Sequence, residues 1–460
     1  MRAILSALAL ALVAFAPASP PQALAQETQQ APPRRGVEIE RVVSPGGIEA
    51  WLVSDATVPM IVVRAYWRGG AAVEPATHIG VTGVMADMLT EGAGDFDSNV
   101  WKERIETLNM SLGFSAGWDG VGMAMTTLSE NRDAAFEMAR LALASPRFDE
   151  APLERIRRQI EIGIRQRETN PGYIANLALD EAIIPGHPYA RRAELETIAR
   201  IDRASLEERR AALLTRARLL ITVVGDIDAQ TLARLLDSTF GHLPQGAALA
   251  DPPVAEVRAG QGVIHRPLPQ PQSLILFAAP GIQDEDPDWI PLAVANYTLG
   301  GGSFSSRLMS EVRESRGLVY GISTGPSVRD FSAQVRGSAQ TQNENVAQAI
   351  EVARGVMRRL HDEGPTQAEV DDAITYLTGS FALELDSNVG IAGVVHSYHV
   401  AGRGIDYINR RNDLIRAVTR ADVQRVMRRL FDPDDFTFVV VGGEAAPAAA
   451  PAPAAPQQQQ

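Results

Sequence analysis

The segment from Leu299 to Tyr320, LGGGSFSSRLMSEVRESRGLVY, holds the residues of this chain whose types and spacing are best suited to chemistry. Arg313 and Tyr320 stand seven residues apart in it. That spacing is about two helical turns, so both side chains would project to one side of a helix or of its exit. Together they would supply a cation and a phenol donor. On spacing alone, a surface arginine and a half-buried strand tyrosine are the simpler interpretation.

A glycine-rich turn precedes this pair. Gly300, Gly301 and Gly302 permit close approach of the backbone and positive φ angles. After the turn we predict a helix with a serine cap at its start, a glycine at its end and one internal ion pair. The residues in those roles are Ser303, Ser305 or Ser306 for the cap, Gly317 for the end, and Arg307 with Glu311 for the i,i+4 pair.

Composition limits the functions that this pair can serve. The chain has 460 residues, of which 45% are hydrophobic and 22% charged, as in a globular protein with room for two or more domains. The formal net charge of −13 and the lack of a basic tract argue against nucleic acid as a partner. Because there is no cysteine, disulfides, thiolate metal sites and a cysteine nucleophile are excluded.

The two ends of the chain differ in composition from the rest. Residues 1–25 combine an early arginine, an apolar run and an Ala-Leu-Ala cleavage pattern, which predicts a secretory signal peptide, followed by a linker at 26–36. No later stretch approaches the roughly 20 apolar residues of a membrane span. We therefore expect a periplasmic or otherwise exported protein, with an uncleaved N-terminal anchor as the lesser alternative. Residues 444–460, rich in Ala, Pro and Gln, predict a disordered tail.

Between these ends the chain repeats itself. The run LLITVVGD at Leu219–Asp226 is matched by FTFVVVGG at Phe436–Gly443, and each is a β-branched strand that closes on a glycine turn. The duplication predicts an α+β fold of two homologous α/β-roll halves, each with a mainly antiparallel sheet and helices packed on one face. We place these domains at 37–243 and 261–443, with a linker rich in Pro, Gly and Ala at 244–260.

The duplicated halves and the LGGGSFSSRLMSEVRESRGLVY segment together resemble the pitrilysin/insulinase-type zinc peptidases, which include the mitochondrial processing peptidase. The resemblance spans residues 37–443. In active members of that family, a helix of the first half carries the motif H-x-x-E-H. Its two histidines bind zinc together with a glutamate further along the chain, and the motif glutamate activates water.

The zinc-binding residues of that family are missing here. The segment GVTGVMADMLTEG places Gly83, Ala86 and Asp87 at the motif positions. The later segment IEIGIRQRETNP places Ile162 and Gly163 where the family has its ligand glutamate. Isoleucine and glycine have no side-chain ligand atom, so we predict that this chain has no family-type zinc site and no cofactor of its own.

Other residues offer only weak alternatives for a metal. His78 with Asp87 and Glu91 would form a mixed nitrogen and oxygen site, although a solvated loop histidine is the simpler interpretation of His78. Three further histidines are assigned no catalytic role: His187, His396 and His399. The last two share a helix face at i,i+3 without a nearby carboxylate, which favours core packing or surface hydration.

The resemblance gives Arg313 and Tyr320 a role. In the family, an arginine and a tyrosine at this spacing lie across a cavity from the zinc, bind the substrate backbone and help to stabilise the oxyanion. A fixed donor aimed at that charge contributes about 3 kcal/mol. Gly300 to Ser303 resemble the glycine-rich stretch that contacts substrate in the noncatalytic subunit of the processing peptidase.

The resemblance therefore implies a heterodimer. The expected partner is a homologous subunit that bears H-x-x-E-H and zinc, the expected substrates are peptides, and the chain alone should be inactive. A second hypothesis is a noncatalytic scaffold or peptide-binding protein with the same fold, in which Arg313 and Tyr320 are incidental. A third is a stand-alone hydrolase with a rearranged site, but no G-x-S-x-G elbow or Ser/His/Asp set supports it.

Overall fold

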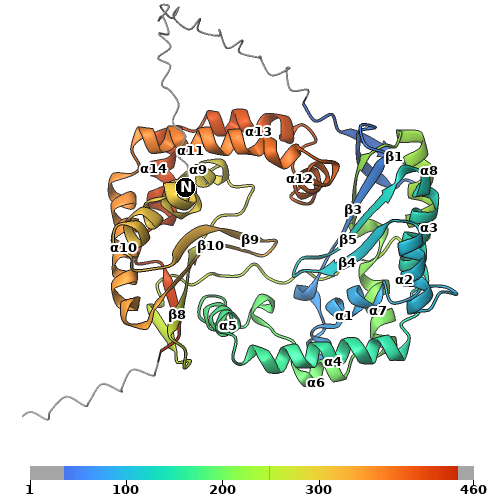
Figure 1. Cartoon of the computed structure of the whole chain (residues 1–460), viewed down its shortest axis with the longest axis horizontal. Coiled ribbons are helices and arrows are strands. Elements are labelled where there is room, and N and C mark those ends of the chain that lie inside the picture. The colour runs from blue at the N-terminus through green and yellow to red at the C-terminus, as the bar shows by residue number, and fades with distance from the viewer. Residues whose placement is uncertain (1–35, 248, 444–460) are drawn as a thin grey trace, which may run out of the picture. The chain divides into compact units, whose positions relative to one another are not determined.

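The computed structural model describes residues 36–247 and 249–443, and the residues from Val37 onward form one unit by their contacts (Figure 1). The predicted signal peptide at 1–25 and the predicted tail at 444–460 lie outside the described residues. The domain limits at 243 and 261 stay predictions.

The first sheet has six strands in the order β1-β2-β6-β3-β5-β4. All neighbours in it are antiparallel except β2 and β6, which are parallel. The strands are β1 Glu40–Val43, β2 Glu49–Ser54, β3 Met60–Arg68, β4 Ser111–Ala116, β5 Gly120–Leu128 and β6 Leu219–Gly225.

The second sheet repeats this arrangement with five strands in the order β7-β11-β8-β10-β9. The strands are β7 Val263–Arg266, β8 Gln272–Pro280, β9 Gly321–Arg329, β10 Ser332–Gln342 and β11 Thr437–Val441. The two matched sequence runs form β6 and β11, and each pairs with a parallel strand on one side and an antiparallel strand on the other. The predicted α+β fold with two mainly antiparallel sheets is confirmed.

Helices occupy most of the sequence between the strands. Many of them begin at a side chain that accepts a backbone N–H, as at Asp97, Asp202, Asp228, Thr366 and Thr419. The helices are α1 Val81–Met88, α2 Ser98–Thr107, α3 Arg132–Ala144, α4 Glu150–Arg167, α5 Pro171–Ile183, α6 Leu195–Ala199, α7 Arg203–Leu213, α8 Ala229–Phe240, α9 Trp289–Asn296, α10 Val346–Glu363, α11 Gln367–Ser380, α12 Asn388–Val400, α13 Tyr407–Arg416 and α14 Arg420–Leu430.

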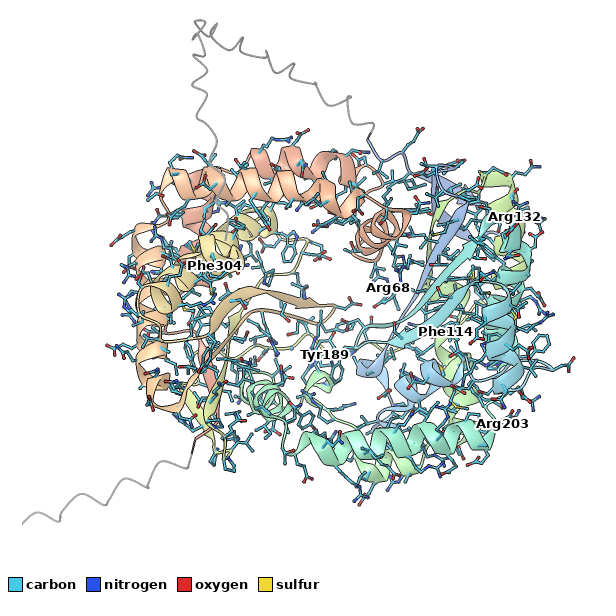
Figure 2. The ribbon with its side chains drawn as sticks, in the orientation of Figure 1. Arg68, Phe114, Arg132, Tyr189, Arg203 and Phe304 are labelled. Atoms are coloured by element: carbon cyan, nitrogen blue, oxygen red, sulfur yellow. The ribbon has the colours of Figure 1, made fainter. Side chains whose placement is uncertain are left out.

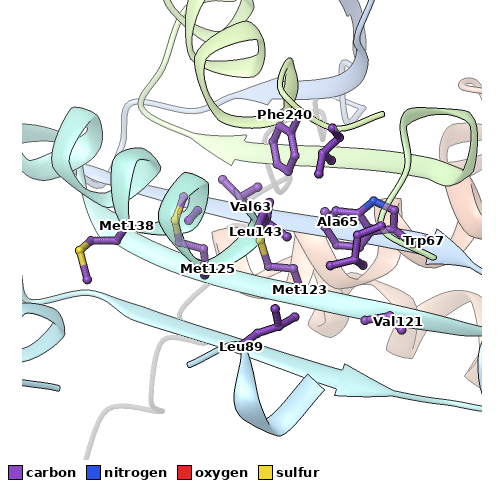
Figure 3. Close-up of a cluster of buried hydrophobic side chains, with 14 of the residues drawn as sticks. Val63, Ala65, Trp67, Leu89, Val121, Met123, Met125, Met138, Leu143 and Phe240 are labelled. Carbon is purple, nitrogen blue, oxygen red and sulfur yellow. The ribbon is translucent and has the colours of Figure 1, made fainter. Parts of the chain in front are cut away.

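Strand β3 shows how side-chain alternation builds the first core. Val63, Ala65 and Trp67 are fully buried on the face that α3 and α8 cover, where Trp67 packs near Phe240 (Figure 3). The residues of β3 that alternate with these three point to the opposite face, because successive side chains of a strand alternate. One of them, Val62, belongs to a different hydrophobic cluster.

That opposite face is covered by a helix from the other half of the chain. Helix α12, from the second half, contacts β3 and β6 of the first sheet (Figure 1). Reciprocally, α5 from the first half contacts β8 and β11 of the second sheet. The structure thus adds a second, exchanged helix layer to the predicted layer on one face. Among the described residues, no helix has both the length and the apolar character required to cross a bilayer.

Candidate functional site

Helix α1 holds the positions at which the resemblance would place the zinc motif, and it packs against α4, the helix expected to bring the further ligand. Ala86 is buried and has no donor atom, and Gly83 has no side chain. On α4, Ile162 is 55% exposed and Gly163 follows it. Gly83, Ala86, Ile162 and Gly163 offer no ligand for a zinc ion, although α1 and α4 pack together as a zinc site built from both helices would require.

The alternative set of His78, Asp87 and Glu91 does not form a metal site either. Glu91 accepts a hydrogen bond from Ser98 at 2.6 Å and pairs with Arg155 at 2.7 Å. Burial would raise the pKa of Glu91, but these two partners together with the charge of Lys102 outweigh burial and hold the pKa below its usual value. Its carboxylate is therefore already committed. Within residues 36–247 and 249–443, no group of three His, Cys, Asp or Glu side chains is placed to hold a metal ion.

The second-half segment folds differently from the predicted helix. It forms a short 3₁₀ turn at Ser303–Ser305 and a π-helical segment, η8, at Met309–Glu314. Gly317 ends the segment as predicted, with φ of 62° and its N–H donating to the Arg313 carbonyl at 2.8 Å. The serine cap is wrong: the Ser306 hydroxyl instead donates to the Ser303 carbonyl at 2.7 Å.

The predicted Arg307–Glu311 pair is also wrong. The Arg307 guanidinium binds both carboxylate oxygens of Glu369 on α11, at 2.7 and 2.8 Å. Glu311 pairs with Arg359 of α10 instead. A two-point arginine–carboxylate contact is stronger and more specific than an exposed i,i+4 pair, so the tertiary contact is formed in place of the local one.

The three glycines allow a close approach of their loop to neighbouring strands and turns. A Cβ atom on Gly300 would lie 2.5 Å from Thr324 Oγ1, and one on Gly302 would lie 2.7 Å from the Tyr297 carbonyl oxygen. Close approach is therefore confirmed. The positive φ falls instead at the next residue, since Ser303 has φ of 49° and none of the three glycines is left-handed.

We expect Gly300→Ala to destabilise the fold by about 1–3 kcal/mol, because its methyl group would overlap Thr324. The matched control is Gly321→Ala. Gly321 lines the same hollow, but no neighbouring atom lies within 4 Å of the place that its methyl group would take. The urea midpoint of each variant measures the effect. Equal midpoints for the two variants would contradict the close-packing explanation of the glycines.

Tyr320 lies at a hollow of about 570 Å³ that Gly300, Gly301 and Ser303 also line. Its side chain is 50% exposed, and its backbone N–H donates to the Gln340 carbonyl at 2.8 Å. The structure thus brings four of the six predicted site residues together. Gly302 contributes to the loop but does not line the hollow.

Arg313 lies outside this hollow. Its guanidinium carbon is 4.8 Å from the centre of the exposed Phe304 ring. The expected common face depended on 3.6 residues per turn. The π-helical turn, the left-handed Gly317 and the non-helical residues that follow it change that spacing. Arg313 and Tyr320 therefore do not line the same hollow.

The sequence analysis did not predict a group of hydrogen bonds that connects the turns of two hairpins. The buried Tyr189 donates its hydroxyl hydrogen to Asp119, at the β4–β5 turn, and accepts the backbone N–H of Phe331, at the β9–β10 turn, at 3.1 Å (Figure 2). The N–H of Asp330 donates to Asp119 at 3.3 Å. Trp118, Asp119, Asp330 and Phe331 border a cavity of about 1140 Å³. The alternation of the strands indicates hairpins, but it carries no information on which turns meet.

His396 and His399 of α12 pack against the first sheet, so of the two predicted alternatives, core packing and surface hydration, core packing applies. The His399 ring stacks on Trp51 with centroids 4.0 Å apart and planes inclined by 5°. His396 Nδ1 lies 3.0 Å from Thr222 Oγ1, and Thr222 is fully buried. The pair therefore belongs to the contact between α12 and the first sheet.

This packing makes stability depend on pH. Burial lowers the pKa of both histidines to about 4. The nearby His399 and Arg64 lower the pKa of His396 further. For His399, the charge of Glu49 raises the pKa and the charge of Arg68 lowers it. The unfolded chain, with an ordinary histidine pKa of about 6.5, binds more protons between the two values. We expect the free energy of unfolding to fall as pH drops from about 6.5 to about 4, by at most about 1.4 kcal/mol per pH unit for each histidine.

Urea titrations at several pH values test this dependence. His399→Phe keeps an aromatic ring over Trp51 without a titrating group, so its decline with falling pH should be shallower. His265→Gln, on the exposed surface of β7, should leave the decline unchanged. A decline equally steep in all three proteins would assign the pH dependence to other groups.

Comparisons with known proteins agree with the fold and with the lack of zinc ligands at the positions described above. The family model described as "Peptidase M16 inactive domain" matches residues 200–377. The chain is 23% identical, over 84% of its length and 90% of the other's, to a protein of Helicobacter pylori named non-peptidase homolog YmxG. It superposes on the crystal structure of a peptidase M16 inactive domain from Pseudomonas fluorescens with TM-score 0.83 and 27% identity, covering 89% of this chain and 98% of that one. The periplasmic protease PqqL of Escherichia coli shares the fold with TM-score 0.77 and 13% identity, and this chain spans 49% of it.

Proposed function

We propose that this chain is the zinc-free subunit of a heterodimeric peptidase. The premise is that it belongs, as a noncatalytic member, to the M16 family of pitrilysin-type peptidases. One observation carries the proposal: the Tyr320 phenol is exposed at a preformed hollow, while the motif positions on α1 hold Gly83, Ala86 and Asp87. On this proposal, the chain keeps the substrate-binding half of the family's site and lacks the half that binds metal.

In this assignment the partner is a homologous subunit that bears H-x-x-E-H, and its zinc supplies the activated water. The residues of this chain hold the peptide. Gly300, Gly301 and Ser303 border the hollow that receives it, and Arg313, outside the hollow beside Phe304, binds a backbone carbonyl of the peptide further along. The Tyr320 hydroxyl donates to the carbonyl oxygen as negative charge develops there. A donor that is fixed before the reaction acts most strongly on that developing charge.

The same proposal places the protein in the periplasm. The apolar N-terminal segment of the sequence has the features of a secretory signal, and a structural neighbour of low identity is named a periplasmic protease. Fractionation of cells into periplasm, cytoplasm and membranes, followed by N-terminal sequencing of the mature chain, tests this placement. A mature chain that begins after residue 25 in the periplasmic fraction would support it, and an intact N-terminus in the cytoplasm would contradict it.

Reconstitution tests the assembly. The lone chain and a homologue from the same genome that bears H-x-x-E-H are purified, mixed, and assayed for complex size, zinc content and cleavage of unfolded peptides. We expect a zinc-free, inactive lone chain and a mixed complex that is more active than the homologue alone. Zinc bound stoichiometrically by the lone chain, or activity unchanged by mixing, would contradict the proposal.

A noncatalytic scaffold or peptide-binding protein is the second candidate. It is favoured by the name of the Helicobacter pylori relative, which describes that protein as a non-peptidase. Under this hypothesis the chain forms complexes or binds peptides, but it raises no peptidase activity with any zinc-bearing homologue. The same reconstitution therefore separates the two candidates.

A further inference from the structure

The hollow beside Tyr320 has a lining without charge. Of the described residues that border it, none is Asp, Glu, Lys, Arg or His, although 22% of the chain is charged. Leu274 is partly exposed in the lining, Met309, Ile322 and Ala339 are core residues that reach it with 4–7% of their surface, and the other side chains are hydroxyls and one amide. The surface offers van der Waals contact and neutral hydrogen bonds, but no counter-charge.

The walls of the hollow are fixed by their own contacts. Gly300 lets its loop close onto Thr324, and Thr324 exchanges two hydrogen bonds with Asn296 at 2.8 and 3.1 Å. The Ile322 N–H points at the Met309 sulfur at 3.4 Å. These bonds join the last residue of α9 and the π-helical segment η8 to the start of β9, and Gly300 belongs to the π-helical segment η6 (Tyr297–Gly301) that follows α9. A site formed before its occupant arrives loses little free energy to reorganisation on binding.

Charged side chains nearby are held in other contacts. Arg307 is bound by Glu369, and Glu311 by Arg359. Arg313 lies over Phe304 and outside the lining. An ionised side chain that entered the hollow would lose water without gaining a counter-charge, which costs free energy, whereas an aliphatic side chain would gain by burial.

We propose that this hollow selects the peptide by accepting one uncharged, aliphatic side chain such as Leu or Met and rejecting Asp, Glu, Lys and Arg. The inference rests on the proposed function of the same segment in binding peptides, and it adds the substrate class. The occupant is a peptide residue because neutral hydroxyls at the rim, including that of Tyr320, provide hydrogen bonds suited to the amide groups on either side of that side chain.

A peptide series tests the selection. Fluorescein-labelled peptides that differ only at one central residue, Leu, Met, Asp or Lys, are titrated with the full-length lone chain and followed by anisotropy. Peptides with Leu or Met should bind at least about tenfold more tightly than those with Asp or Lys. Equal affinities across the series would overturn the selection and leave the proposed function standing.

Two aspartate variants locate the site. Ser323→Asp places a carboxylate in the lining from an exposed position of β9, and should reverse the order so that the Lys peptide binds most tightly. Ser327→Asp adds the same charge to the same strand outside the hollow, and should leave the order unchanged. Circular dichroism of both variants confirms that each is folded. The same shift with both variants would place the binding site elsewhere.

Failure of the inference is distinguishable from failure of the proposed function. If the lone chain binds no peptide but reconstitution yields activity, selection by the hollow is rejected, and the shared peptidase stands with its peptide held by the assembled pair of subunits. If neither binding nor activity is found, both are rejected.

Discussion

Tyr320→Phe is expected to lower the kcat of the reconstituted peptidase by about 10²-fold or more, the typical effect of removing one oxyanion donor. The substitution removes a single hydroxyl from a half-exposed side chain, so the fold and the hollow should be retained. Because the lost hydrogen bond forms chiefly when negative charge develops, KM should change by less than about threefold. Steady-state kinetics of mixtures with the zinc-bearing homologue, at saturating variant, measure both constants.

The control for this experiment is Tyr376→Phe. Tyr376 on α11 is similarly exposed and packs beside Tyr297, with ring centroids 5.0 Å apart, but it does not line the hollow. Its kcat should equal that of the wild type. Mixtures with Tyr320→Phe that retain full kcat would remove Tyr320 from the shared site and favour the scaffold hypothesis.

Asp180→Ala should produce the largest loss of stability. Asp180 on the exchanged helix α5 is 2% exposed and pairs with Arg192 at 2.6 Å and with Arg336 of β10. Removing the carboxylate leaves two adjacent, mostly buried guanidinium groups without their counter-charge. Loss of one member of a buried pair costs about 3–5 kcal/mol. A urea titration near pH 7, compared with wild type, measures this loss.

Asp413→Ala is the matched control. Asp413 pairs with Arg416 on α13 at 2.9 Å, but its side chain is 80% exposed. An exposed pair of this kind contributes at most about 1 kcal/mol, so the midpoint should move little. A loss for Asp180→Ala no greater than that of Asp413→Ala would show that the ion pairs of α5 do not hold it to the second sheet.

The duplicated fold could be predicted because its signal is local. Runs of β-branched residues that end at glycine form β6 and β11, and both occupy equivalent places in their sheets. The exchange of α5 and α12 could not be predicted in the same way. An apolar helix face shows that a surface is buried, but the surface that covers it belongs to a distant part of the chain.

The candidate site also has features that the sequence predicts and features that it does not. The loss of the zinc ligands follows from residue identity at Gly83, Ala86, Ile162 and Gly163, since no packing can give these side chains a ligand atom. The closeness of the glycine loop to its neighbours was also expected, because glycine is the residue that tolerates it. The ion pair between Arg307 and Glu369 was not expected, because a rule based on local spacing takes no account of a carboxylate 62 residues away.

The sequence by itself therefore determined the fold, the absence of side-chain ligand atoms at Gly83, Ala86, Ile162 and Gly163, and the presence of a phenol at Tyr320. Only the tertiary structure decided where those groups lie. Tyr320 lines the hollow and Arg313, in the π-helical turn before the left-handed Gly317, does not. Contacts among Thr324, Met309 and Asn296 shape the hollow. The physical reason is that residue type and periodicity act over one or two turns, whereas side-chain direction and cavity lining depend on packing between segments far apart in the chain.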